Sequence, residues 1–265
     1  MSCCFDLSEY TGAPDNSPCV TAVDVPALVR ELDALNAGGR ETEGAALLES
    51  ARAVACEQGD WRSELSVLSE LLGQYRRGTD AGRALAAVDA AMELIRSHGL
   101  GRTVSGATVM LNAATTLRCF GRAEQSIPIF RHVCLVYGAT LDPSDYRFAA
   151  LYNNMAGSCA EAGGIEEAER CYLLALDVLR SCPDPGNDEA VTLCSLAELY
   201  ERRGDEDRAN DCMERAWAAL NAPGLPRDGY HAFAVSKCVP CFEHFGYFIY
   251  SMELKRRVKA IYEGT

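Results

Sequence analysis

Hydrophobic residues recur every three or four positions along most of the chain, which is the period of amphipathic helices. The apolar segments come in pairs, and a glycine marks the turn between the two members of most pairs. Several prolines fall between the pairs, where helices must stop, whereas Pro128 falls early in a predicted second helix. Runs of β-branched residues, which favour strands, are scarce. The pattern therefore predicts an all-α protein built from helix-turn-helix units.

The paired segments repeat with a period of about 42 residues. A small residue marks the same point of the second helix in every unit: Gly44, Ala84, Ser126, Ala168, Ala209 and Ser251. Two helices can cross closely only where no bulky side chain keeps their backbones apart, so we expect these residues to be buried crossing points. Four glycines lie five positions before a crossing residue, where a left-handed residue ends a helix: Gly121, Gly163, Gly204 and Gly246.

The clearest unit contains Tyr152, Met155-Ala156, Gly163, Ala168 and Tyr172, and the next unit repeats these residue classes. This succession of large, small, glycine, small and aromatic residues resembles the tetratricopeptide repeat family. The period of about 42 residues is similar to that of kinesin light chains, a subgroup of this family. The resemblance covers roughly residues 25–263, and it implies a superhelix whose first helices line a concave, peptide-binding face.

The predicted fold class is therefore all-α, an α-α superhelix (solenoid) of about six helix-turn-helix repeats. The units are expected near residues 25–64, 65–106, 107–148, 149–189, 190–231 and 232–265. Residues 1–24 match no repeat and contain turn-forming residues, so we expect a mobile leader before a repeat domain at 25–265.

Asparagines supply the first candidates for a binding face. Asn112 and Asn154 occupy equivalent positions in two units, directly before the small residues of the first helix. An amide there can donate to and accept from an extended peptide backbone. Asn153 and Ser195 are expected on the same side of their helices. The alternative is structural, with the asparagine side chain bonded within its own helix or to water.

Arginines supply a second candidate pair. Arg76 and Arg118 also occupy equivalent positions, further along the expected groove. Paired guanidinium groups would suit a carboxylate or an acidic peptide segment. The alternative is that each arginine is exposed and paired with a nearby glutamate.

One group of residues has the composition of a metal site. Cys238, Cys241 and His244 are spaced so that they share one face of a helix, and both residue types bind zinc. Cys238 also falls on the packing frame of the repeat, and a fourth ligand is not evident. Core packing is therefore the favoured interpretation, and no cofactor is expected.

Charge and composition narrow the function further. The net charge of −13 repels a phosphate backbone, so nucleic acid is not an expected partner. The sequence contains no stretch of about 20 apolar residues that would span a membrane. The start of the sequence lacks the pattern of a secretory signal, so we expect a cytoplasmic protein with reduced cysteines.

These observations favour a non-catalytic scaffold that binds a protein or peptide partner in the concave face. The sequence contains no recognisable motif of a nucleophilic or phosphate-binding enzyme. A peptide-sensing regulator that acts through a partner, and an enzyme with an unrecognised site, are the alternatives. A homodimer formed through an exposed end of the solenoid also stays open.

Overall fold

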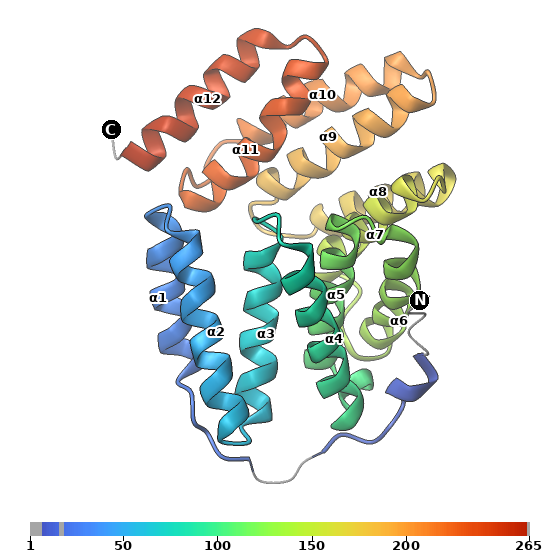
Figure 1. Cartoon of the computed structure of the whole chain (residues 1–265). Coiled ribbons are helices and arrows are strands. Elements are labelled where there is room, and N and C mark those ends of the chain that lie inside the picture. Colours follow the sequence, from blue (N-terminus) through green and yellow to red (C-terminus); the bar gives the residue numbers. More distant parts are fainter. Residues whose placement is uncertain (1–6, 16–18, 264–265) are drawn as a thin grey trace. The chain divides into compact units, whose positions relative to one another are not determined.

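The computed structural model describes residues 7–15 and 19–263. Within these ranges it contains twelve α-helices, two short 3₁₀ helices and no strand (Figure 1). The predicted all-α fold of about six helix-turn-helix repeats, in the α-α superhelix class, is confirmed. The chain divides into two compact units, residues 1–141 and 142–265.

Each unit contains three helical hairpins. In unit 1 the helices are α1 (Val25–Ala37), α2 (Glu41–Glu57), α3 (Trp61–Tyr75), α4 (Ala81–Ser97), α5 (Val104–Cys119) and α6 (Ala123–Thr140). The 3₁₀ helices of this unit are η1 (Leu7–Tyr10) and η2 (Leu100–Arg102). In unit 2 the helices are α7 (Arg147–Glu161), α8 (Ile165–Leu179), α9 (Gly186–Arg202), α10 (Glu206–Leu220), α11 (Gly229–His244) and α12 (Phe248–Glu263).

The first helices of successive hairpins contact one another, so they form a row within each unit. In unit 1, α3 contacts both α1 and α5, and in unit 2, α9 contacts both α7 and α11. Each first helix also packs against the second helix of its own hairpin. This row of first helices is the surface on which the sequence places its candidate binding residues.

The predicted crossing residues lie in the second helices and are buried. Ala168 in α8 and Ala209 in α10 are at most 1% exposed. Gly44 in α2 shows why size matters, because a Cβ atom there would meet the Leu32 Cδ1 atom of α1 at 2.9 Å. The large residues four positions later fill the core in five of the six hairpins: Leu48, Val88, Phe130, Tyr172 and Met213. The last hairpin departs from the pattern, since exposed Lys255 stands at that position.

The turns within the hairpins follow the predicted glycines. Gly163 ends α7 with a φ of 85°, and Gly204 ends α9 with a φ of 73°. These values lie in the left-handed region, which glycine adopts without steric cost. The predicted role of Gly121 and Gly246 is confirmed in the same way. Aspartate side chains cap the N-termini of five helices: Asp24, Asp60, Asp80, Asp205 and Asp228.

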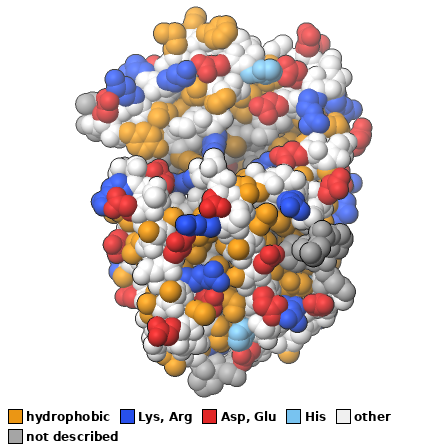
Figure 2. Space-filling view, in the orientation of Figure 1, with side chains coloured by type: hydrophobic (Ala, Val, Ile, Leu, Met, Phe, Trp, Pro, Cys, Tyr) orange, Lys and Arg blue, Asp and Glu red, His pale blue; other side chains and the backbone are white. Residues whose placement is uncertain are grey.

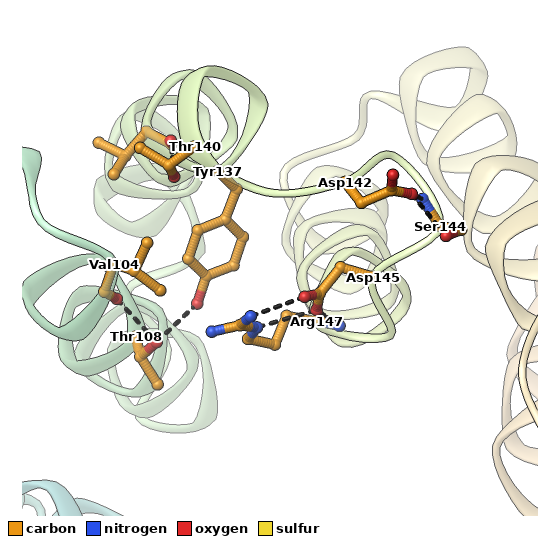
Figure 3. A network of polar contacts seen from close by, with 9 residues as sticks. Val104, Thr108, Tyr137, Thr140, Asp142, Ser144, Asp145 and Arg147 are labelled. Carbon is orange, nitrogen blue, oxygen red and sulfur yellow. Dashed lines mark hydrogen bonds and ion pairs between the residues drawn. The ribbon is translucent and has the colours of Figure 1, made fainter.

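A hydroxyl chain holds α6 against α5 within unit 1 (Figure 3). The Thr108 hydroxyl donates to the Val104 carbonyl oxygen at 2.9 Å and lies 2.8 Å from the Tyr137 hydroxyl. Since the proton of Thr108 is used on Val104, the Tyr137 hydroxyl donates to Thr108. The Tyr137 side chain is 1% exposed, so this hydrogen bond satisfies a polar group that would otherwise be costly to bury.

The described residues before α1 pack against helices of unit 1. The backbone N–H of Asp15 donates to the carbonyl oxygen of His98 at 2.9 Å, and its carboxylate lies 3.0 Å from His98 Nδ1. The buried carboxylate of Asp60 accepts a 2.7 Å hydrogen bond from the backbone N–H of Ala22. Residues 1–6 and 16–18 of the predicted leader lie outside the described residues. The mobility of residues 1–24 stays a prediction.

The surface carries both signs of charge and some exposed apolar side chains. Acidic and basic side chains are interspersed over the face shown in Figure 2. Among the described residues, no helix is both long enough and apolar enough to cross a membrane. Exposed apolar residues occur early in α12, where Phe248, Ile249 and Met252 are 62%, 82% and 71% exposed.

Since a small residue is required where the two helices of a hairpin cross, enlarging Ala209 should destabilise the protein. Ala209→Leu adds a branched side chain at a position that is 1% exposed, and overpacking of this kind costs about 1–3 kcal/mol of unfolding free energy. Ala218→Leu is the matched control, because Ala218 is exposed on the same helix. Urea unfolding followed by circular dichroism should show the loss only in Ala209→Leu. Equal stability of the two variants would contradict the requirement for a small residue at the helix crossing.

Candidate functional site

A cavity of about 450 Å³ lies in unit 2, along its row of first helices. The N-terminal halves of α7 and α9, the connector between α8 and α9, and the start of α11 form its walls. The lining residues are Tyr146, Ala149, Ala150, Asn153, Leu179, Cys182, Pro183, Asp184, Pro185, Asp188, Thr192 and Tyr230. The volume is within the usual range for ligand sites, and it is sufficient for one large side chain.

Asn153 is the predicted binding residue that lines this cavity. It follows Ala149 and Ala150 by one helical turn, so all three residues share one face of α7. The Oδ1 atom of Asn153 is buried and has no hydrogen-bond partner among the described residues. A buried amide oxygen without a partner costs about 1–3 kcal/mol, so this side chain is held in the free protein at the expense of stability.

Asp188 and Tyr230 form a pair at one wall of the cavity. The Tyr230 hydroxyl donates to Asp188 Oδ1 at 2.5 Å, and this bond joins α11 to α9. Burial and the hydrogen bond to Asp188 raise the pKa of Tyr230 above its ordinary value, so the hydroxyl stays protonated. The Thr192 hydroxyl donates to the main-chain oxygen of Asp188 at 2.8 Å. Both hydroxyl protons are therefore used on Asp188.

The connector between α8 and α9 supplies a second carboxylate, Asp184. It stands between Pro183 and Pro185 and has a φ of 51°, which lies in the left-handed region. Few residues other than glycine adopt this conformation, although aspartate and asparagine do so more often than most. Strain at a residue that lines a cavity is typical of functional sites.

Three basic side chains of unit 2, Arg147, Arg180 and Lys237, have partners of their own. Arg147 forms two hydrogen bonds with Asp145, at 2.8 Å and 2.6 Å (Figure 3), and this contact lowers the pKa of the Asp145 carboxyl to about 2. Arg180 donates to Asp177 at 3.0 Å. The ammonium group of Lys237 lies 5.4 Å from the centre of the Phe233 ring.

The other predicted residues of unit 2 bond to their own helices. The amide nitrogen of Asn154 donates to the carbonyl oxygen of Ala150 at 2.9 Å, and the Ser195 hydroxyl donates to that of Val191 at 3.2 Å. Both side chains are half-buried. For Asn154 the structure shows the local hydrogen bond that the sequence left open as the alternative to ligand binding.

In unit 1 the structure brings Arg76 and Asn112 together. The guanidinium of Arg76 donates to the Asn112 carbonyl oxygen and to the Thr116 hydroxyl, both at 3.2 Å. The Asn112 amide donates to the Ser69 hydroxyl at 2.9 Å. Burial lowers the pKa of Arg76. These contacts fasten α3 to α5, and Arg118 lies half-buried further along α5.

The three metal candidates are divided between the core and the surface. Cys238 and Cys241 are buried, and the Cys241 thiol donates to the carbonyl oxygen of Cys194 at 3.6 Å. His244 is exposed, and its Nε2 atom lies 2.8 Å from a carboxylate oxygen of Glu201. Among the described residues, no group of three or more histidine, cysteine, aspartate or glutamate side chains is arranged to hold a metal ion.

Sequence analysis missed most of the polar lining of the cavity. Tyr146, Asp184 and Asp188 lie at helix starts or in a connector, outside the repeat frame that guided the prediction. The two prolines around Asp184 marked a break between helices but carried no indication of a cavity. Tyr230 reaches Asp188 from 42 positions along the chain, and only the fold shows that contact.

Two comparisons with known proteins agree with this architecture. Residues 147–222 match the tetratricopeptide repeat family. Among curated proteins, none matches the sequence. The predicted resemblance to tetratricopeptide proteins with repeats like those of kinesin light chains is confirmed by the family match and by the solved structures that follow.

The similar solved structures show the fold alone, because their sequence identities are low. BtubC (BKLC) from P. vanneervenii superposes with a TM-score of 0.64 at 19% identity, over 74% of this chain and 80% of that one. A putative kinesin light chain from Podosopora anserina with nearly identical TPR-like repeats gives 0.54 at 15% identity, over 74% and 94%. MamA from Desulfovibrio magneticus RS-1 gives 0.52 at 14% identity, over 77% and 99%.

The unpaired amide predicts a stabilising substitution in the cavity. Asn153→Leu keeps a similar side-chain volume and removes the buried oxygen, so the free energy of unfolding should rise by about 1 kcal/mol. Asn187→Leu is the matched control, because buried Asn187 accepts a 2.8 Å hydrogen bond from His231 Nδ1. Chemical denaturation should show a gain for the first variant and a loss for the second. A loss of stability in Asn153→Leu would contradict this account of the amide.

Proposed function

We propose, from the premise that residues 147–222 form tetratricopeptide repeats, that this chain is a non-catalytic scaffold that binds a protein or peptide partner. Proteins of this kind generally bind protein partners, and their rows of first helices suit extended peptides. The proposed binding surface is the row formed by α7, α9 and α11 in unit 2.

The cavity at Asn153 is the observation that carries this proposal. It opens where the row of first helices is made of small residues, Ala149 and Ala150, so that space is left for a partner side chain. The amide of Asn153 has both a donor and an acceptor. Its oxygen is buried in the free protein and would pair with the main chain of the partner once the side chain rotates toward the cavity. An extended peptide that passes along the row would place one side chain in the cavity and its backbone beside this amide.

Binding explains the lining residues better than catalysis does. No histidine is present among the lining residues that the structure describes, and the Cys182 thiol donates to the carbonyl oxygen of Val178 at 3.6 Å. A nucleophile and a base within hydrogen-bonding reach of each other would favour an enzyme. A regulator that senses a peptide and acts through a further protein uses the same surface and is the second candidate.

The proposal includes a cytoplasmic location, and it excludes nucleic acid and membranes as partners. Each cysteine among the described residues is a free thiol, which suits a reducing compartment such as the cytoplasm. The net charge of −13 disfavours nucleic acid and anionic membrane surfaces as partners.

Self-association through α12 is a further proposal. Phe248, Ile249 and Met252 are exposed near the start of this helix, and an apolar group of this kind suits contact with a second copy. Light scattering after size-exclusion chromatography should give the mass of a dimer for the native chain and of a monomer for Ile249→Glu. A monomeric native chain at all concentrations tested would contradict the dimer.

The scaffold proposal predicts that filling the cavity weakens peptide binding. Peptides selected from a random displayed library on the full chain would be synthesised and titrated by calorimetry. Ala150→Trp places an indole in the cavity and should weaken binding by at least about tenfold, which is 1.4 kcal/mol. Ala218→Trp, on the exposed side of α10, should leave the affinity unchanged.

Two results would overturn the scaffold proposal. The first is a library selection that yields no peptide with saturable binding to the native chain. The second is a selected peptide whose affinity falls equally in Ala150→Trp and Ala218→Trp, since the cavity would then have no specific part in binding.

A further inference from the structure

We propose that the cavity of unit 2 binds a cationic, donor-rich side chain of the partner, namely an arginine guanidinium. This inference rests on the proposed function, because it names the class of peptide that the scaffold would accept. Three properties of the lining support it: its charge, the direction of its hydrogen bonds and its aromatic surface.

The charge of the lining is negative. Asp184 and Asp188 contribute two carboxylates, and the lining residues that the structure describes include no lysine, arginine or histidine. Arg147 and Arg180, which are close in sequence, are held by Asp145 and Asp177. A cation entering the cavity would therefore meet carboxylates that no basic lining residue neutralises, whereas an anionic side chain would be repelled.

The hydrogen bonds of the lining leave acceptors for a ligand. Tyr230 and Thr192 have both directed their hydroxyl protons to Asp188, one to the side chain and one to the main chain. The second carboxylate oxygen of Asp188, the carboxylate of Asp184 and the hydroxyl lone pairs remain as acceptors. A guanidinium has five N–H donors and no acceptor, so its hydrogen-bonding pattern complements this lining.

The aromatic residues favour a planar cation. Tyr146 is 68% exposed and Tyr230 is 52% exposed, and both line the cavity. A guanidinium stacks on such rings and can at the same time form two parallel hydrogen bonds with a carboxylate. A lysine ammonium has the same charge but lacks the planar fork, so we expect it to bind more weakly at this site.

The backbone at Asp184 adds an independent observation. Glycine would adopt this left-handed conformation more easily, yet the position is occupied by an aspartate that lines the cavity. A requirement for negative charge in ligand binding would explain why an aspartate occupies this strained position between two prolines. The other prediction, that paired arginines bind an acidic peptide, has less support, because half-buried Arg76 is already hydrogen-bonded to Asn112 and Thr116.

The probe for the test is a short capped peptide of glycine and alanine with one central arginine. Matched peptides replace the arginine by citrulline, which has nearly the same shape without the charge, by lysine, or by glutamate. Titration of the isotopically labelled full chain, followed by two-dimensional NMR, should show saturable shifts at Asn153, Asp184 and Asp188 for the arginine peptide. The citrulline peptide should bind at least about tenfold more weakly, and the glutamate peptide should cause no saturable shift.

Substitutions in the protein test the contact between the carboxylates of the cavity and the arginine of the peptide. Asp184→Asn and Asp188→Asn should each reduce the affinity for the arginine peptide several-fold and reduce its advantage over the citrulline peptide. Asparagine keeps the shape of the side chain and tolerates the left-handed conformation at position 184. Asp211→Asn, on the exposed surface of α10, removes the same charge away from the cavity and should change nothing.

The outcomes separate this inference from the scaffold proposal. Equal binding of the arginine and citrulline peptides, tighter binding of the lysine peptide, or absence of shifts at the cavity would overturn the arginine assignment. If library-selected peptides lose affinity in Ala150→Trp but contain no basic residue, the scaffold proposal stands and this inference fails. If the selection yields no binding peptide at all, the scaffold proposal fails as well.

Discussion

The close crossing of the two helices in each hairpin is the constraint on which this structure depends. Ala168 and Ala209 are buried at such crossings, and a larger side chain would separate the helices there. Close packing fixes the direction of each first helix relative to the next, and so produces the row of α7, α9 and α11. The cavity is a consequence of this row, because the short side chains of Ala149 and Ala150 leave space beside Asn153.

The site differs from the core in how its polar groups are satisfied. In unit 1, Asn112 and Arg76 use their polar atoms on Ser69, Thr116 and the main chain, so they contribute to stability. In unit 2, Asn153 has an unpaired buried oxygen and Asp184 has a left-handed backbone. Both features are unfavourable in the free protein, and both line the same cavity. Unfavourable features that are concentrated at one cavity lower the stability of the free protein, and such features are typical of a binding site.

The helices and their crossings were predictable because they depend on local periodicity and on residue size. The glycines that end α7 and α9 were predictable for the same reason, since the left-handed conformation favours one residue type. The direction of long side chains was not predictable, so the hydrogen bonds of Arg76 to α5 became evident only in the structure. Asn153 was found through the repeat frame, whereas the bond of Tyr230 to Asp188 joins residues that belong to different hairpins. Contacts of that kind arise from tertiary packing, which cannot be inferred from the residue pattern of a single sequence.

The most direct test of the central claim is a crystal structure of the full chain with a library-selected peptide bound. The account predicts an extended peptide along α7, α9 and α11, with one side chain in the cavity between Asn153 and Asp188 and with the Asn153 oxygen hydrogen-bonded. A peptide bound on the second helices, α8 or α10, with the cavity empty and the amide still unpaired, would contradict it.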